Sequence, residues 1–464
     1  MSQRHDGASS IHGLDDAGPL PIPPGSIESM VEMALEAPAD ERLSEYRELI
    51  HRREGKFLLL KEGLDPENLR EAGWGLVVPE TVSTEVIEAL QPLIDKRCQE
   101  TGESRPRQLT YRAGESGAGF LTRYGLGPGP VDPSRVPYYL LLVGPPTAIP
   151  FAFQQYLGVK HAVGRVDFEV VSDYQSYAEN VVRCEQTACR LERRVGLFGP
   201  LHDEMTQQSN EYLFHPLQEA LGVVDEWKVD SYLGPEAKKE CHLDLVGGSS
   251  PPAFLLSVCH GLGWQYGHHG QRDFQGAQVC QPPGTGMDQG HSYVAGDDID
   301  RCQRGPQGQI LFMNGCFSAG TPKYNTYRHR GREEDDLCAP EPFTARLAQR
   351  LLAHPEGALA VLGHVDRTWN YTFRWPGPDL PQVAVFESAS RALMQGRRVG
   401  AAIEQSFGHR FAELSVQLAE IQNDCAFGYE PGLHLRRVLT ARNDAKSVVV
   451  LGDPAVRLAV EFAD

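Results

Sequence analysis

The amino-acid sequence contains a series of short, continuous apolar runs separated by polar and Gly- or Pro-rich segments. Such runs are typical of strands that are covered on both faces. They alternate with segments whose apolar residues recur at helical spacing, which predicts an α/β fold with a mainly parallel sheet between two helical layers. The predicted strands span residues 74–80, 136–144, 161–171, 194–199, 222–233, 253–261, 309–316, 358–365 and 447–453.

Helical periodicity and composition divide the chain into three parts. Residues 1–26 are rich in Gly, Pro, Ser and Asp and lack an apolar signal core, so we expect a flexible arm. Residues 27–105 are expected to form an N-terminal extension of helical and mixed αβ character, and 106–464 the main domain. The segments with helical spacing are 27–60, 81–100, about 173–194, 343–357 and 399–422.

Composition excludes several classes of protein. The chain has 464 residues, is 41% hydrophobic and carries a net charge of −18, which argues against a nucleic-acid-binding surface. It contains no apolar stretch long enough to span a membrane. Its ten cysteines are scattered without a CxxC pair, which favours reduced thiols in a cytoplasmic protein and gives no zinc signature.

Two of the predicted strands end in residues that carry chemistry. "AFLLSV" is followed by Cys259, His260 and Gly261, and "QILFMN" by Gly315 and Cys316. If the strands are neighbours, His260 and Cys316 share the edge of the sheet where ligands bind in α/β proteins. An imidazole can deprotonate a nearby thiol, and small residues around it leave backbone N–H groups for an oxyanion hole.

The order of these motifs resembles that of the caspase-like (clan CD) cysteine peptidases, which include caspases, gingipains, separase and bacterial CHAT domains. The resemblance covers about 130–464 and rests on "VPYYLLLVGPPTAIPF", "AVGRVDF", "SVCHGLG", "FMNGCFSAG", "GALAVLGHVDRTW" and "VVVLGDPAVRLAV". It implies a caspase-like three-layer αβα sandwich that cleaves peptide bonds through a thioester, without a cofactor. It also implies that His260 is the base, Cys316 the nucleophile, and the N–H groups of Gly261 and Cys316 the oxyanion hole.

The third catalytic residue stays open at this stage. Gingipains carry an acidic residue just after the strand that reads "LLLVG" here, but this chain has Pro145 and Pro146 at that point. Caspases function without such a carboxylate, so the difference does not exclude activity.

The segment "GHVDRTW" suggests the substrate preference. In gingipain and separase the strand after the cysteine leads into the pocket for the residue before the cut. Trp369 is predicted to form a wall of that pocket, and Asp366 to pair with a basic side chain. We therefore expect cleavage after Arg or Lys.

A charged segment follows the cysteine strand. Residues 324–336 have little apolar content and are predicted to form an exposed, activation-type loop. Arg328, Arg330 and Arg332 are candidate processing sites for the enzyme itself or for an upstream activating protease, and a regulatory subunit is a further possible partner. The resemblance and the compartment favour a regulated bacterial peptidase of stress or defence that acts on protein substrates.

Two other functions are weighed against this one. The chain could be a catalytically inactive binding module of the same fold, although an intact Cys–His pair argues against that reading. It could also be a metal-dependent hydrolase that uses His268 and His269 in "YGHHGQRDF". Adjacent histidines on a Gly-rich loop are more typical of a solvated turn, and the sequence has no HExxH helix, so we expect no metal.

Overall fold

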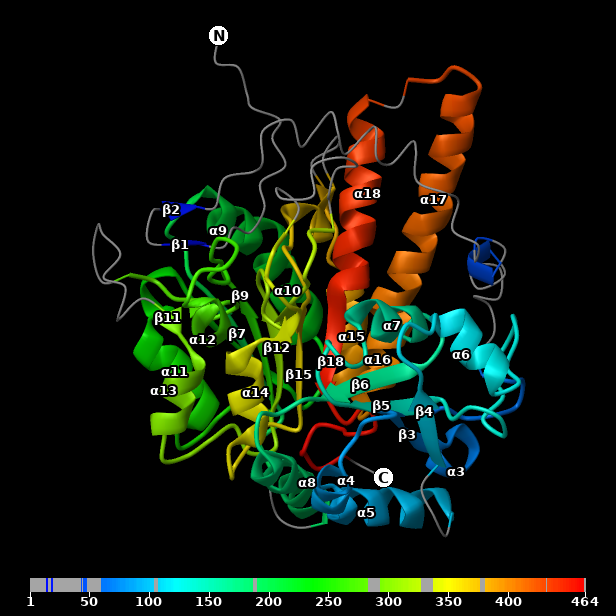
Figure 1. Ribbon diagram of the computed structural model, residues 1–464. Helices are drawn as coiled ribbons and strands as arrows, with labels where there is room; N and C mark the ends of the chain where they lie inside the picture. Colours follow the sequence, from blue (N-terminus) through cyan, green and yellow to red (C-terminus); the bar gives the residue numbers. More distant parts are fainter. Residues whose placement is uncertain are drawn as a thin grey trace.

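The fold is seen in a computed structural model (Figure 1). The structure describes residues 14–15, 18–19, 43, 45–47, 60–103, 107–186, 190–282, 293–326, 337–375, 380–430 and 432–462. Most of the predicted arm and of the predicted helical segment 27–60 lies outside these ranges. Leu43 and residues 45–47 are helical.

The described residues form a ten-stranded central sheet in the order β4-β3-β5-β6-β18-β15-β12-β9-β7-β8. Nearly all strand residues in its interior are buried, as continuous apolar runs require. The predicted α/β class and the mainly parallel sheet are confirmed. The strands are β3 (Trp74–Pro79), β4 (Arg107–Tyr111), β5 (Tyr139–Val143), β6 (Ala162–Val166), β7 (Arg194–Gly199), β8 (Lys228–Leu233), β9 (Phe254–Val258), β12 (Ile310–Asn314), β15 (Ala360–His364) and β18 (Val448–Gly452).

One antiparallel pairing divides the sheet into two halves. β18 runs parallel to β6 but antiparallel to β15, and the other pairings are parallel. We call β4, β3, β5, β6 and β18 the β5 half, and β15, β12, β9, β7 and β8 the β12 half. The carboxyl ends of the strands therefore lie at opposite edges of the sheet in the two halves.

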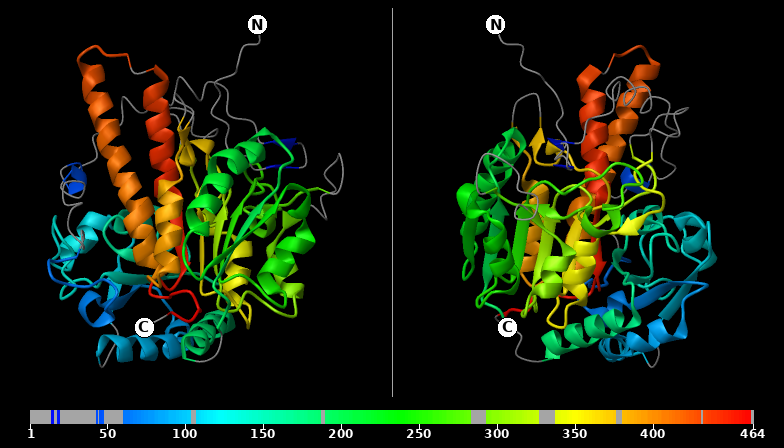
Figure 2. Two further views of the ribbon diagram at one scale, coloured as in Figure 1. Left: turned by 180° about the vertical axis from the view of Figure 1, so that it is seen from behind. Right: turned by 60° about the vertical axis from the view of Figure 1, so that its left-hand side comes forward.

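Helices cover both faces of the sheet, as the two further views in Figure 2 show. One layer is a row of contacting helices: α4 (Thr84–Ala89), α5 (Gln91–Thr101), α8 (Val171–Gln186), α14 (Arg346–Ala353) and α13 (Gly296–Arg301). The other layer includes α10 (His215–Gly222), α15 (Ala384–Met394) and α16 (Val399–Ile403). Further helices are α3 (Leu69–Ala72), α6 (Gly117–Arg123), α7 (Phe151–Leu157), α11 (Lys239–Gly247) and α12 (Gln271–Phe274).

Side-chain alternation explains why both faces are covered. In β3 and β5, Leu76 and Leu141 belong to the main core, whereas Val77 and Leu140 join a second cluster with residues of α6 and α7. Successive strand residues point to opposite faces, so a strand that is apolar throughout needs a helical layer on each side.

Two predicted helices are interrupted. Residues 81–100 divide into α4 and α5, with Pro92 in the first turn of α5, where its missing N–H costs no helical hydrogen bond. Residues 399–422 pass from α16 through a π-helical turn, Glu404–Gly408, into α17 (His409–Ala426). α17 and α18 (Gly432–Ser447) pair as a hairpin that projects from the body (Figure 1).

The sheet is continuous across the predicted boundary at residue 106. β3, on the N-terminal side of that boundary, pairs with both β4 and β5 on the other side. Among the described helices, none has both the length and the apolar composition that crossing a bilayer requires.

Candidate active site

The carboxyl ends of β9 and β12 bring the predicted catalytic residues to one edge of the sheet. The two strands pair in parallel with Val258 opposite Asn314, so the residues that follow each strand emerge side by side. A Cβ on Gly261 would lie 1.9 Å from the carbonyl oxygen of Cys316. Only glycine lets the two backbones approach this closely, which explains why a glycine follows His260.

His260 is held by a carboxylate from a third strand end. Its Nε2 lies 2.6 Å from Oδ2 of Asp203, which follows β7, the neighbour of β9. Asp203 caps α9 (Glu204–Ser209), and its Oδ1 accepts a hydrogen bond from the Thr206 backbone N–H at 2.9 Å. Burial raises the pKa of Asp203, but the hydrogen bond and charge of His260 outweigh it, and the net pKa is lowered. Asp203 is therefore an ionised carboxylate that fixes the imidazole.

The partner of Nε2 assigns the tautomer of His260. Because a carboxylate only accepts, Nε2 carries a proton and donates it to Asp203. In the neutral ring Nδ1 is then the basic nitrogen, and it is buried without a hydrogen-bond partner among the described residues. A buried base with an unused lone pair is the group that a thiol needs for activation.

Cys316 is a covered thiol in this structure. Its side chain is fully buried, and Sγ accepts a hydrogen bond from the Thr368 backbone N–H at 3.4 Å. Burial raises the pKa of Cys316 to about 12, and the Thr368 N–H offsets only part of that rise. The thiol is therefore protonated at neutral pH, and a substrate can reach it only after the covering residues move.

Asp366 lies beside the cysteine loop in a strained backbone conformation. Its φ is 87°, and that of Phe317 is 57°; both values lie in the left-handed region. The Phe317 N–H donates to the Asp366 carbonyl at 2.8 Å, which joins the two loops. The carboxylate accepts from the N–H and hydroxyl of Thr326 at 2.9 and 2.6 Å and from the Arg367 N–H at 2.7 Å. Both Asp366 oxygens are thus engaged within the protein.

Trp369 is placed in a packed apolar cluster. It is 4% exposed and packs with Leu414 and Leu418 of α17 and with Leu435 and Val438 of α18. This packing ties the loop after β15 to the α17–α18 hairpin.

A second histidine joins the Asp203–His260 pair. Nε2 of His202 lies 3.9 Å from Oδ2 of Asp203, and the rings of His202 and His260 are 5.6 Å apart. Among the described residues, these three form the group of His, Cys, Asp or Glu side chains close enough to share a metal ion. His268 and His269 are not part of it: His268 stacks on Trp264 at 4.3 Å.

Sequence reasoning missed Asp203. The resemblance directed attention to Pro145 and Pro146, which follow β5. β5 runs opposite to β9, so the residues after it emerge at the other edge of the sheet. The available signal was the acidic residue in "GPLHDEM", just after the strand 194–199. Arg328, Arg330 and Arg332 lie outside the described residues.

The chain was also compared with known proteins. No model of a protein family matches the sequence, and no curated protein matches it. Solved structures resemble its fold. The Arg specific cysteine proteinase gingipain R (RGPB) is 13% identical, with a TM-score of 0.47 over 86% of this chain and 80% of that chain. A structure described only as a protease is 13% identical over 83% and 78% of the two chains, with a TM-score of 0.47.

A third structure, the complex of the pro- and mature domains of Porphyromonas gingivalis RgpB, is 12% identical over 83% and 79% of the two chains, with a TM-score of 0.44. Identities as low as these show a likeness of fold alone.

Proposed function

We propose that this protein is a cysteine endopeptidase in which Cys316 is the nucleophile, His260 the base and Asp203 the residue that orients the base. The observation that supports the proposal most is the 2.6 Å contact between His260 and Asp203. It leaves Nδ1 of His260 as a buried base at the same sheet edge as the thiol. All three residues follow strands that pair side by side in the sheet, which supports the proposal.

The reaction follows from these positions. Nδ1 of His260 takes the Sγ proton, and the thiolate attacks the scissile carbonyl carbon. The negative charge then develops on the carbonyl oxygen, where the N–H groups of Gly261 and Cys316 can donate. His260 returns the proton to the leaving amine as the C–N bond breaks. Water, deprotonated by the same nitrogen, hydrolyses the thioester and restores the thiol.

Activation is part of the proposal, because the thiol is covered. Thr326 is bound to Asp366, and Asp366 is bound to the loop of Cys316, so a cut beyond residue 326 acts on a segment that abuts the site. We propose that cleavage after Arg328, Arg330 or Arg332, by the enzyme itself or by an upstream protease, activates the protein. Binding of a regulatory subunit is the alternative way of activating it. A cytoplasmic role in bacterial stress or defence stays a prediction of the resemblance.

We also propose that the enzyme prefers Arg or Lys as the residue before the cut. Asp366 is buried. Its Oδ2, which a basic substrate side chain would contact, now accepts hydrogen bonds from the N–H and the hydroxyl of Thr326. An incoming guanidinium therefore has to displace Thr326. This exchange would couple opening of the site to recognition of a basic residue.

The test is a fluorogenic peptide panel that varies the residue before the cut, read before and after limited trypsin treatment. We expect turnover confined to Arg and Lys peptides and abolished in Cys316→Ala. Cys259→Ala is the matched control, because Cys259 is also buried but its Sγ lies 3.1 Å from Gln278 Oε1. Turnover after Asp would overturn the role of Asp366. No turnover by any variant, treated or untreated, would favour a binding module.

A further inference from the structure

We propose that His202, Asp203 and His260 form a Zn²⁺ site that switches off the catalytic base when occupied. The switching rests on the proposed function, whereas the metal site itself does not. No motif spacing in the sequence points to this site, because His260 comes from a different strand end from the other two ligands.

The three side chains already face a common point. The Asp203 carboxylate Oδ2 lies 2.6 Å from His260 Nε2 and 3.9 Å from His202 Nε2, and one ligand atom from each residue lies within 4.8 Å of the others. Ligands 2.0–2.2 Å from a tetrahedral zinc ion lie about 3.4 Å apart. A small rotation of His202 towards Asp203 and a slight separation of the Asp203–His260 pair meet that spacing.

His202 lacks the partners that a structural histidine has. Both of its ring nitrogens are buried without a hydrogen bond among the described residues, although most buried polar atoms in proteins have one. Coordination of a metal would satisfy one of them. The Asp203 side chain is 38% exposed and that of His202 15%, so a hydrated cation can enter from solvent.

The donor set also selects the metal. Two imidazoles and one carboxylate match the three-ligand zinc sites of proteins, which leave a fourth position for water. Hard cations such as Mg²⁺ and Ca²⁺ prefer oxygen ligands and are disfavoured here. Cys316 is not needed as a ligand.

Occupancy would remove the base in two ways. A metal on Nε2 takes the nitrogen that now donates to Asp203, so the one remaining ring proton of His260 must reside on Nδ1. Nδ1 then has no lone pair with which to accept the thiol proton. Asp203, bound to the cation, no longer orients the ring for catalysis.

The first experiment measures binding alone, in the full-length Cys316→Ala protein titrated with Co²⁺ and then Zn²⁺. We expect weak d–d absorption without a sulfur-to-cobalt charge-transfer band, displaced by Zn²⁺. His202→Ala should weaken binding at least about tenfold, a loss comparable to that caused by altering residues around a metal. His268→Ala is the matched control, because His268 lies outside the cluster, and should leave binding unchanged.

A second experiment tests the switch on the active protein. Zn²⁺ should inhibit peptide cleavage, and a chelator should restore it. To inhibit His202→Ala to the same fraction of its own metal-free rate, at least about tenfold more Zn²⁺ should be needed. Three results would overturn the site. Metal binding could be unchanged by His202→Ala, it could be absent from the Cys316→Ala protein, or the Co²⁺ spectrum could contain a charge-transfer band from a thiolate. If no peptide is ever cleaved, loss of binding in His202→Ala alone still supports the site while the proposed function fails.

Discussion

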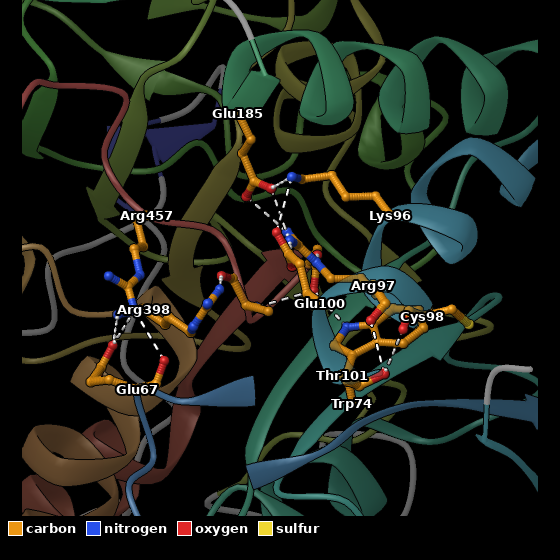
Figure 3. A network of polar contacts seen from close by, with 12 residues as sticks. Glu67, Trp74, Lys96, Arg97, Cys98, Glu100, Thr101, Glu185, Arg398 and Arg457 are labelled. Carbon is orange, nitrogen blue, oxygen red and sulfur yellow. Dashed lines mark hydrogen bonds and ion pairs between the residues drawn. The ribbon is translucent and has the colours of Figure 1, made fainter. Parts of the chain in front are cut away.

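Two buried polar centres lie at strand ends in opposite halves of the sheet, and they are built differently. In the β5 half, Arg97 of α5 is fully buried and donates to Asp453 at 2.7 Å, to Glu100 at 2.6 Å and to Glu185 at 2.8 Å. Figure 3 shows this Arg97 network with Lys96 beside Glu185. In the β12 half, His260 and His202 retain buried nitrogens that make no hydrogen bond to any residue the structure describes.

The two centres show how buried polar groups serve structure in one place and chemistry in the other. Asp453 follows β18, and its oxygens accept from Arg97, from the Trp74 indole at 3.0 Å and from the Ala455 N–H at 3.0 Å. A buried charge with this many partners is compensated and holds helix, strand and chain end together. Nitrogens without partners cost stability but remain available to accept a proton or a metal.

The largest effect that would test this comparison is loss of the Arg97 guanidinium. Arg97→Ala leaves the Asp453 carboxylate buried without its cation and should lower the free energy of unfolding by about 3–5 kcal/mol. Urea denaturation followed by tryptophan fluorescence measures it. Arg301→Ala is the control, because its side chain is 74% exposed and its guanidinium lies 3.6 Å from Asp298, and should change stability by less than about 1 kcal/mol. Equal losses in both variants would contradict the structural role of the network.

A change in the β12 half should damage activity instead. Gly261→Ala places a Cβ against the Cys316 carbonyl and forces the two loops apart, so kcat/KM should fall by about 10²–10³-fold through loss of the oxyanion donors. Peptide cleavage by the activated protein measures the fall. In the control variant Gly222→Ala the added Cβ meets nothing within 4 Å. Unimpaired cleavage by Gly261→Ala would remove Gly261 from the site.

Glu404 tests pH dependence in the β5 half. It is fully buried, Tyr138 donates to it at 2.8 Å, and burial raises its pKa from 4.5 to about 8. Between these pH values the folded state keeps a proton that the unfolded state has lost, so stability falls as pH rises. Glu404→Gln should remove this fall and be more stable than the wild type by about 2–4 kcal/mol at pH 9.

The measurement for Glu404 is denaturation at pH 4 and at pH 9. The two proteins should differ little at pH 4, where the carboxyl group is protonated in both the folded and the unfolded states. Parallel stability curves for wild type and variant across this range would refute the assignment, and peptide cleavage at pH 7 should be the same in both.

The smallest expected effect is at the positioning residue. Asp203→Asn keeps the shape of the side chain but removes its charge, so kcat should fall by about 10–100-fold with little change in KM. The separate effects on kcat and KM are the readout, because a residue that only orients the base changes the rate of the chemical step and leaves substrate binding intact. Asp203→Glu should restore part of the rate. An unchanged kcat in Asp203→Asn would mean that Asp203 acts only in capping α9.

Local patterns in the sequence predicted the α/β class and nine of the ten strands of the central sheet, because continuous apolar runs require cover on both faces. They missed the edge strand β4, whose residues are not continuously apolar and are only partly buried. That the strands ending at His260 and Cys316 are neighbours was a condition of the prediction, and the pairing of β9 with β12 meets it. The resemblance also singled out Gly261, but the close approach of its backbone to Cys316 is a tertiary contact between two strand ends. The stretch "VVVLGDPAVRLAV" entered the prediction only through the resemblance, and nothing in it indicated that Asp453 accepts a hydrogen bond from the buried Arg97.

Which strand ends meet depends on the long-range packing of the sheet. The antiparallel pairing of β18 with β15 sends the residues after β5 to one edge and those after β7, β9 and β12 to the other. Asp203 and His202 therefore join His260, whereas Pro145 does not. Strand order and direction are set by long-range packing, which no local pattern encodes. The same packing covers Cys316 and seats Trp369 against the α17–α18 hairpin.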